Sequence, residues 1–325
     1  MIRIAMMGYW HVHAGDYTKQ ILNSGRAKIV GVYDKEPLRG QEWAGKLGVL
    51  CYTDPDALLS GEKVDAVVVN TPTCDHEEII IKAARAGKHI FTEKVLAASY
   101  DSAVRIAGEV KKAGVQFVIS FPHRTFPHNL FVKGLLERGK LGTPTYMRMR
   151  NAHDGAVGGW LPPHFYDPAE ACGGAMMDLG AHPMYLIQWL MGTPESMFSV
   201  FTHMSGHEVE DNAVSVMSYA NGAIAVSETG FMTPAAPEFL EVQGTEGTVQ
   251  VLGVDNIVWL KEGKAAFRRV GEAEMPPPGK GAMEQFLDAV ETGESPLFGI
   301  EDAVALSRLM DAAYRSHREK RLVTL

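Results

Sequence analysis

The first 121 residues alternate short apolar runs with helical segments, and this alternation restricts the fold more than any other feature of the chain. Runs rich in Ile, Val and Ala are typical of strands that helices cover on both faces, and a helix between two strands makes those strands parallel. The pattern therefore predicts an open, doubly wound parallel sheet. The strands are expected at residues 2–7, 27–34, 64–70, 89–92 and 115–121.

The ends of these strands carry the residues that a dinucleotide requires. The first strand ends at Gly8 before a helix, and the second strand closes on Asp34. A strand, a glycine turn, a helix and a strand that ends in an acid form the dinucleotide-binding, Rossmann-type unit. Asp34 would accept hydrogen bonds from the adenosine ribose and repel a 2′-phosphate, so NAD is the expected cofactor and NADP is less favoured.

The glycine turn departs from the usual spacing of this unit. Trp10 and His13 occupy the positions where the second and third glycines normally stand. Because the second glycine lets the backbone approach the pyrophosphate, Trp10 makes a close approach harder. We expect a phosphate loop that is displaced, or one that does not hold a dinucleotide in the usual way.

Past residue 122 the helix–strand alternation gives way to a different pattern. A helix near residues 127–138 and a strand at 145–151 precede a glycine- and proline-rich loop at 154–173, and short alternating strands follow. The dipeptide Asn221-Gly222 between two of them indicates a hairpin. We therefore expect two domains, a dinucleotide-binding domain at 1–122 and an α+β domain at 123–325, the latter an open, mainly antiparallel sheet with helices on one face.

An acid and a histidine stand four residues apart in the stretch 173–183. At that spacing Asp178 and His182 would share one face of a helix. Asp178 could then hold His182 in one tautomer, which suits a histidine that takes and returns a proton. A buried histidine satisfied by a neighbouring acid is the alternative, and Pro183 predicts a kink or a helix restart.

Motifs along nearly the whole chain fall in the order of one known family. They are Gly8, Asp34, the stretch 70–76, Glu93-Lys94, the turn 139–144, and Gly173-Gly174 through Asp178 to His182. In these positions the chain resembles the Gfo/Idh/MocA oxidoreductases, the family of glucose–fructose oxidoreductase and inositol dehydrogenase. It differs from them at Trp10 in the phosphate turn and at Val95, where the family usually has a proline.

The resemblance implies an NAD(P)-dependent oxidoreductase that moves a hydride between nicotinamide and a hydroxyl carbon of a sugar or cyclic polyol. His182 would be the base, Asp178 its orienting partner, and Lys94 the cation that stabilises a developing alkoxide. The expected cofactor-binding residues are Gly8, Trp10, His11, Asp34, Asn70, Thr71, Pro72, His76, Glu93 and Lys94. The residues expected to line the substrate pocket are Arg124, His153, Trp160, His164 and Tyr166.

Other functions remain open at this point. Relatives that retain NAD and cleave glycosidic bonds make a glycoside hydrolase or lyase an alternative, and a non-catalytic NAD- or sugar-binding protein is another. The pair His11-x-His13 resembles the metal-binding start of amidohydrolase barrels. Such a barrel needs eight strand–helix units, whereas this chain becomes antiparallel after the fifth or sixth, so no metal is expected.

Composition narrows the expected partners and location. A net charge of −8 without a basic block argues against nucleic acid and anionic membranes as partners. No apolar run approaches the length of a membrane span, and the N-terminus enters a strand without a signal peptide, which favours the cytoplasm. The predicted strand at 212–219 has apolar residues on both faces, so we expect a homodimer or homotetramer through the second domain's sheet.

Overall fold

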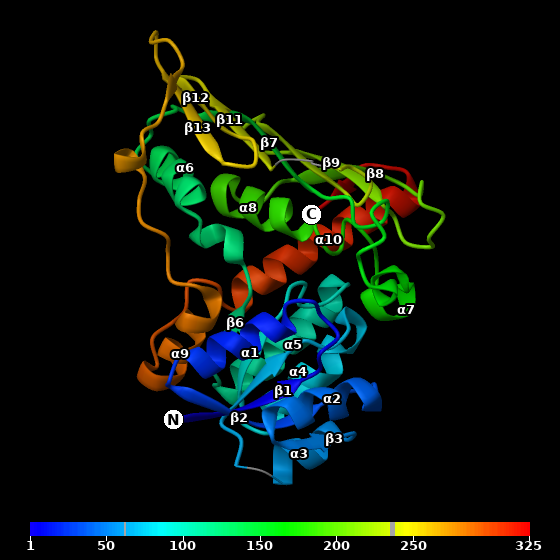
Figure 1. The fold of residues 1–325 in the computed structure, drawn as a ribbon. Helices are drawn as coiled ribbons and strands as arrows, with labels where there is room; N and C mark the ends of the chain where they lie inside the picture. Colours follow the sequence, from blue (N-terminus) through cyan, green and yellow to red (C-terminus); the bar gives the residue numbers. More distant parts are fainter. Residues whose placement is uncertain (62, 235–237) are drawn as a thin grey trace. The chain divides into compact units, whose positions relative to one another are not determined.

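The computed structural model describes residues 1–61, 63–234 and 238–325 (Figure 1). The chain divides into two compact units. Unit 1 comprises Met1–Ser120 and Lys280–Ser307, and unit 2 comprises Phe121–Gly279 and Arg308–Leu325. The first boundary lies two residues from the predicted one, but residues 280–307, which the sequence analysis placed in the second domain, belong to unit 1.

Unit 1 is built on a six-stranded parallel sheet in the order β3-β2-β1-β4-β5-β6. The order reverses between β1 and β4, which is the position where ligands bind in open sheets of this kind. The predicted Rossmann-type fold class is confirmed. The strands are β1 Ile2–Met7, β2 Ala27–Tyr33, β3 Leu50–Tyr52, β4 Ala66–Val69, β5 His89–Thr92 and β6 Phe117–Ile119, and the helices between them are α1 Ala14–Asn23, α2 Pro37–Leu47, α3 Pro55–Gly61, α4 His76–Arg85 and α5 Tyr100–Ala113.

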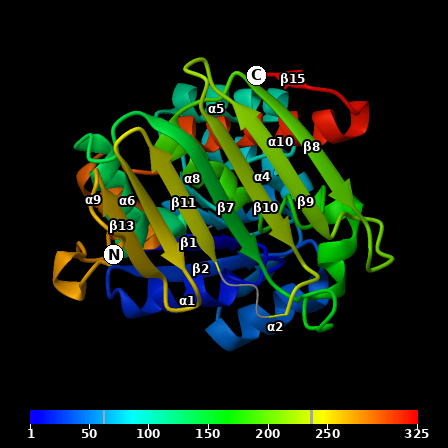
Figure 2. The ribbon, with the colours of Figure 1, turned by 90° about the horizontal axis from the view of Figure 1, so that it is seen from above.

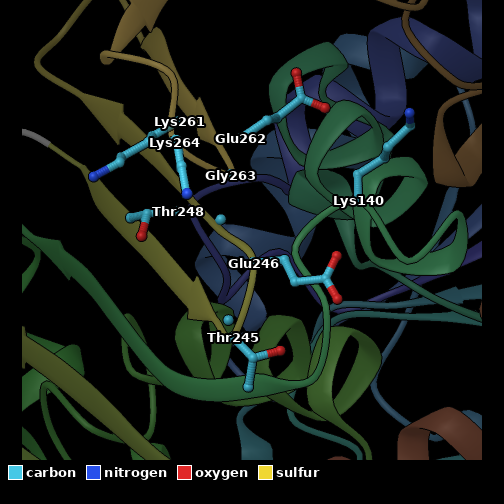
Figure 3. Close-up of a pocket in the computed structure, with 10 residues that line it drawn as sticks. Lys140, Thr245, Glu246, Thr248, Lys261, Glu262, Gly263 and Lys264 are labelled. Carbon is cyan, nitrogen blue, oxygen red and sulfur yellow. The ribbon is translucent and has the colours of Figure 1, made fainter.

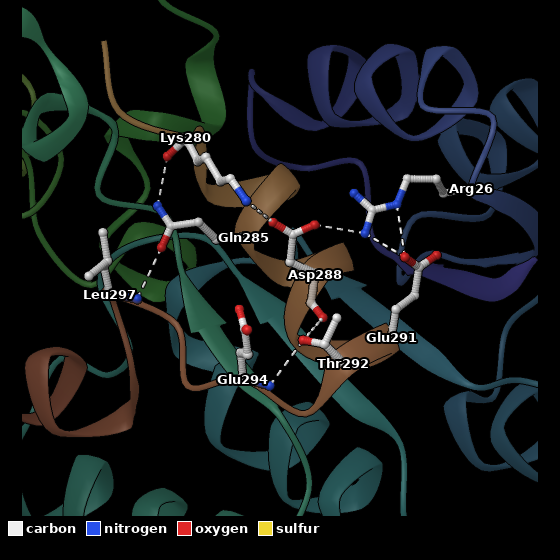
Figure 4. Close-up of polar contacts among 8 residues, drawn as sticks. All are labelled: Arg26, Lys280, Gln285, Asp288, Glu291, Thr292, Glu294 and Leu297. Atoms are coloured by element: carbon white, nitrogen blue, oxygen red, sulfur yellow. Dashed lines mark hydrogen bonds and ion pairs between the residues drawn. The ribbon is translucent and has the colours of Figure 1, made fainter. Parts of the chain in front are cut away.

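A segment from the C-terminal part of the chain completes unit 1. Its helix α9, Ala282–Thr292, places Phe286 edge-on against Phe91 of β5 with ring centroids 5.8 Å apart, and both rings are fully buried. Figure 4 shows the polar contacts of this helix, in which Asp288 pairs with Arg26 at 2.8 Å and with Lys280 at 2.7 Å. Because exposed ion pairs contribute little to stability, the buried aromatic contact is the main reason that this segment belongs to unit 1.

Unit 2 is built on a nine-stranded sheet in the order β14-β13-β12-β11-β7-β10-β9-β8-β15 (Figure 2). All neighbours are antiparallel except β7 and β10, as predicted for a mainly antiparallel sheet. Helices α6, α8 and the C-terminal half of α10 lie on one face. The bounds are β7 Pro144–Ala152, β8 Ser196–Thr202, β9 Asn212–Ser218, β10 Ile224–Gly230, β11 Phe239–Gly244, β12 Gly247–Leu252, β13 Ile257–Glu262, β14 Arg268–Arg269, β15 Val323–Thr324, α6 Pro127–Glu137, α7 Pro168–Ala171, α8 Ala181–Met191 and α10 Ile300–Glu319.

The other face of this sheet carries a row of half-exposed apolar side chains. On β8 and β9 buried and exposed residues alternate, and the exposed ones pair across the strands, Phe198 opposite Val216 and Val200 opposite Val214. We call Phe198, Val200, Val214, Val216 and Ile224, which are 40–52% exposed, the outer apolar face. Both faces of the sheet are thus apolar, as predicted. Among the described residues, no helix is both long enough and apolar enough to cross a bilayer.

Candidate active site

The loop after β1 is tied to the ends of β2 and β4. The Gly8 N–H donates to Tyr33 O at 2.7 Å, and the N–H groups of Trp10 and His11 both donate to Asn70 O at 3.2 Å. Gly8 has φ = +91°, and a Cβ there would lie 2.9 Å from the backbone nitrogen of Thr71, so only glycine fits. The ends of the three strands therefore form one connected edge.

Asp34 follows β2, and its carboxylate is enclosed by four donors. The N–H groups of Tyr9 and Glu36 each donate to it at 2.8 Å. Arg39, from α2, adds Nε at 2.9 Å and Nη2 at 2.7 Å, one to each carboxylate oxygen. The Asp34 side chain is 0% exposed. The acid that sequence reasoning assigned to the ribose is thus already a bidentate ion pair, which the sequence analysis did not foresee.

Unpaired polar atoms at the end of β4 fit a bound dinucleotide. The side-chain amide of Asn70 and the hydroxyl of Thr71 are buried without a hydrogen-bond partner in the described chain. Such groups cost about 1–3 kcal/mol each unless a partner satisfies them. They lie where the strand order reverses, so the polar groups of a nucleotide would satisfy them there. Trp10, 4% exposed, is packed within the loop.

The loops after β4 and β5 are joined by His76. Its Nδ1 lies 2.9 Å from Val95 O and its Nε2 lies 3.2 Å from Thr71 O. Burial lowers the pKa of His76 below its ordinary value. The ring therefore connects the carbonyl of Thr71, which precedes Pro72, to the carbonyl of Val95, which follows the cis peptide bond between Lys94 and Val95. His76 supports the expected cofactor-binding loops from within the protein.

Glu93, at the end of β5, is a second buried acid of unit 1, with a side chain that is 2% exposed. One oxygen accepts hydrogen bonds from Tyr17 Oη and from His13 Nδ1 at 2.9 Å, and the Lys94 N–H donates to the other at 2.9 Å. His11 Nδ1 lies 3.6 Å away. Burial alone would raise the pKa of Glu93, but the two histidines and Lys94 outweigh it, and the pKa lies well below its ordinary value. Lys94 itself is 4% exposed.

In unit 2 Asp178 and His182 do not lie on one helix, although their spacing predicted a shared helix face. Helix α8 begins at Ala181, and Asp178 lies in the preceding turn, where its N–H donates to Gly174 O at 2.9 Å. Pro183 falls in the first turn of α8, where a missing N–H costs nothing, so the proline accompanies a helix start.

The hydrogen-bond partner of His182 Nδ1 is Tyr185, three residues further along α8. The two atoms are 2.9 Å apart, and the Tyr185 hydroxyl also accepts the His123 N–H at 3.1 Å. Tyr185 is held in place by stacking on Phe121, with centroids 4.3 Å apart. The sequence analysis did not single out Tyr185, although its spacing from His182 could have indicated the contact.

His123 was also missed, because a lone histidine is exposed by default. The structure buries it to 9% exposure and stacks its ring on His182, with centroids 4.2 Å and planes 16° apart. Its Nδ1 lies 3.4 Å from Glu238, a carboxyl whose pKa burial raises. His182 is therefore packed between a stacked imidazole and a tyrosine hydroxyl.

The glycine pair before His182 is explained by a buried acid that no spacing in the sequence revealed. Glu210 Oε1 accepts the N–H groups of Gly174 at 2.9 Å and Met176 at 3.0 Å, and the hydroxyl of Tyr314 at 2.5 Å. A Cβ on Gly173 would collide with the Tyr314 hydroxyl, and one on Gly174 with the carbonyl of Glu210. Glu210 and Tyr314 thus hold the turn that leads into α8.

The residues expected to line the substrate pocket have different neighbours: Arg124 contacts Trp189, and the others make ring contacts among aromatic residues. Arg124 lies over the ring of Trp189 at 5.1 Å, next in sequence to His123. His153 stacks on Phe231, and the ring of Trp160 contacts His153. Tyr166 meets Phe231 edge-on and stacks on His207, and His164 lies against Phe165. Trp160 is 54% exposed, so an aromatic face is available for a ligand.

A surface pocket elsewhere in unit 2 contains none of these residues (Figure 3). It lies between the turn at Lys140 and the ends of β11, β12 and β13, and lysines and glutamates of mixed sign surround it. Its charged side chains are Lys140, Glu246, Lys261, Glu262 and Lys264. Among its lining residues, the sequence analysis had named only the turn at 139–144, as a family motif.

Comparison with known families decides the assignment. Residues 2–121 match the oxidoreductase family with the NAD-binding Rossmann fold, and residues 130–250 match the GFO/IDH/MocA C-terminal domain. The chain belongs to the Gfo/Idh/MocA oxidoreductase family. It is accordingly an NAD(P)-dependent oxidoreductase that acts on CH–OH groups, with its NAD-binding domain in residues 2–121, as the sequence motifs predicted.

Individual members of the Gfo/Idh/MocA family match over almost the full length. The chain is 27% identical over 314 residues to D-xylose 1-dehydrogenase (NADP+) 2 of Haloferax volcanii, covering 93% of this chain and 94% of the relative. It is 28% identical over 318 residues to myo-inositol 2-dehydrogenase of Thermotoga maritima, covering 92% and 91%. The structure of levoglucosan dehydrogenase with NADH and levoglucosan superposes with a TM-score of 0.85 at 20% identity, covering 99% of each chain.

Proposed function

We propose that the protein transfers a hydride between nicotinamide and a hydroxyl carbon of a sugar or cyclic polyol, with His182 as the group that takes and returns the hydroxyl proton. The names of the relatives support the substrate class, since the xylose and inositol dehydrogenases match over nine-tenths of the chain. The observation that carries the proposal is the contact between His182 Nδ1 and the Tyr185 hydroxyl at 2.9 Å.

This contact joins His182 Nδ1 to a hydroxyl that can accept or donate a hydrogen bond. A backbone N–H can only donate, so the Tyr185 oxygen uses one lone pair to accept from His123. The hydroxyl can then accept from a protonated His182 Nδ1, and we assign His182 this tautomer, in which the lone pair of the neutral ring is on Nε2. His182 Nε2 is then the atom that receives the substrate proton, and Tyr185 is a positioning residue.

The remaining roles follow from the family motifs. When bound, the nicotinamide accepts or supplies the hydride. Gly8, Asn70 and Thr71 would bind the dinucleotide, with Pro72 and His76 supporting that loop. From the motif Glu93-Lys94 we assign Lys94 as a cation that lowers the cost of a developing alkoxide. Asp178 would be a second polar group near His182, which takes and returns the hydroxyl proton.

The exposed aromatic surface of unit 2 would contact the sugar. Apolar C–H faces of a sugar pack on aromatic rings, and Trp160 is half exposed with its Nε1 donating to Asp154 at 2.9 Å. His153, His164 and Tyr166 would line the same region, with Arg124 beside His123. A second copy of the chain, joined through the outer apolar face, would form a homodimer or homotetramer.

The proposal is tested by turnover with a substrate panel. Aldoses, inositols and anhydrosugars are offered with NAD and with NADP, and the reduced nicotinamide is followed by its absorbance. The expected result is turnover of at least one member that is lost in His182→Ala. Coenzyme binding without turnover of any member, in either reaction direction, would contradict the proposal and leave a binding protein.

A further inference from the structure

Two histidines and a glutamate converge in unit 1. His11 and His13 stand two residues apart in the loop after β1, and Glu93 follows β5. Both strands end at the same edge of the parallel sheet, so residues 80 positions apart in the chain become neighbours. One ligand atom from each residue, the two imidazole nitrogens and a carboxylate oxygen, lies within 4.8 Å of the others.

The separations suit a bound cation. His13 Nδ1 is 2.9 Å and His11 Nδ1 is 3.6 Å from Glu93 Oε1. Ligand bonds of about 2.0–2.2 Å in a tetrahedron place ligand atoms roughly 3.3 Å apart, between these two values. The Glu93 and His11 side chains are 2% and 5% exposed, while His13 is 43% exposed and could rotate to complete the site from the solvent side.

The Glu93 carboxylate is also oriented by hydrogen bonds from groups other than the two histidines. The Tyr17 hydroxyl donates to Glu93 Oε1, and Ser120 Oγ lies 2.8 Å from the same hydroxyl. The Lys94 N–H donates to the other carboxylate oxygen at 2.9 Å. Metal-ligating carboxylates are typically oriented by outer hydrogen bonds of this kind. A plain ion pair between Glu93 and His13 needs one histidine, and the structure supplies two.

We infer that His11, His13 and Glu93 bind a divalent transition-metal ion of the zinc class at the carboxyl ends of β1 and β5. Two imidazole nitrogens and one carboxylate oxygen suit such an ion, whereas Mg²⁺ and Ca²⁺ prefer oxygen ligands. Three protein ligands leave a fourth position for water or a ligand oxygen. The sequence analysis expected no metal, because it considered His11 and His13 only as the start of a barrel that this chain does not form.

The test is a titration of the full-length protein after dialysis against a chelator. Calorimetry with Zn²⁺ should give one equivalent per chain with a Kd of about 1 μM or tighter. Co²⁺ should develop the visible absorption of a tetrahedral site. His13→Gln, on a partly exposed side chain, should weaken Zn²⁺ binding by at least about 100-fold, and Tyr17→Phe by about 10-fold. Mg²⁺ should not bind.

The matched control is His203→Gln, since His203 is an exposed histidine outside the cluster. It should bind Zn²⁺ as the unaltered protein does. Absence of a stoichiometric Zn²⁺ equivalent, or equal binding by the unaltered protein and His13→Gln, would overturn the inference. A parallel NAD titration of the metal-free protein reports on the proposed function separately, so the two can fail independently.

Discussion

Arg39 donates one hydrogen bond to each carboxylate oxygen of Asp34, at 2.9 Å and 2.7 Å. The Asp34 side chain in this bidentate ion pair is fully buried. The arginine is 25% exposed, so its charge lies on the solvent side of the acid. It therefore offsets the negative charge that would repel the 2′-phosphate of NADP. We therefore expect Asp34 and Arg39 together to determine the coenzyme preference.

The first prediction concerns Arg39→Ala. Removing the cation leaves the Asp34 carboxylate uncompensated, so NADP binding should weaken by about 10-fold relative to NAD binding, a difference of about 1.4 kcal/mol. Calorimetric titration with each coenzyme measures the ratio. Lys46→Ala, an exposed cation of the same helix paired with Glu42, is the control and should leave the ratio unchanged. A shift of Arg39→Ala toward NADP would contradict this account.

The turn before α8 yields a prediction about stability. Gly174→Ala would drive a methyl group into the carbonyl of Glu210, and overpacking of a buried site typically costs about 1–3 kcal/mol. Urea unfolding should show a loss of at least about 2 kcal/mol. Gly45→Ala is the control, because α2 has open space there and alanine favours helix by about 1 kcal/mol. Equal losses of unfolding free energy in Gly174→Ala and Gly45→Ala would contradict the conclusion that Glu210 and Tyr314 hold this turn.

His128 should make the fold sensitive to acid. Burial lowers the pKa of His128 to about 4, against 6.5 for an ordinary histidine. The unfolded chain thus takes up a proton first as the pH falls below about 6.5, and stability is lost down to about pH 4, by up to roughly 3 kcal/mol. His128→Gln should reduce the dependence of the unfolding free energy on pH between about pH 6.5 and pH 4. If the unfolding free energy of His128→Gln depended on pH as that of the unaltered protein does, the role given to His128 would be wrong.

The outer apolar face should mediate self-association. Val216 lies within it, opposite Phe198, so Val216→Glu would bury a charge in the interface and dissociate the assembly. Val254→Glu, at a position that is 79% exposed and off this face, should leave assembly intact. Sedimentation at micromolar concentration distinguishes the species. A 35.5 kDa species alone for the unaltered protein would contradict the prediction.

Much of the fold could be predicted because hydrophobic periodicity is a local property. The strand expected at 89–92 appears as His89–Thr92, and Asn221-Gly222 forms the expected turn, with φ = +84° at Gly222. Residues 280–307 were assigned to the wrong unit because helical periodicity shows that a helix buries one face, and does not show which core receives it. The contact of Phe286 with Phe91 decided that, and such a contact is visible only in three dimensions.

The sequence predicted where the residues of the candidate site lie, but not which side chains contact them. Gly8, Asp34, Asn70 and Glu93 lie at the strand ends where the motif placed them. The sequence did not predict that Arg39, His13 and Tyr17 contact them, nor the contacts of Tyr185 and Glu210 in unit 2. Arginine, histidine, tyrosine and glutamate occur in many surroundings, so their residue type alone does not identify a partner. Asp178 was misplaced because a spacing of four implies a shared face only inside a helix, and the glycines at 174 and 180 form a turn before α8.

Companion variants separate the roles around His182. Tyr185→Phe keeps the stack on Phe121 and loses only the hydroxyl, so it should lower turnover by about 10-fold while a histidine-type acid limb remains. Asp178→Asn should cost less than loss of His182. Lys94→Ala should lower the rate without moving the acid limb, because lysine supplies charge and does not titrate there.

The most direct test is the turnover of His182→Ala at saturating coenzyme and substrate, measured across pH with NAD affinity determined in parallel. The account predicts a loss of about 10²- to 10⁴-fold, an acid limb present in the unaltered protein and absent from the variant, and NAD binding unchanged within about twofold. Near-normal turnover by His182→Ala on the best substrate, with the acid limb retained, would contradict the central role assigned to this histidine.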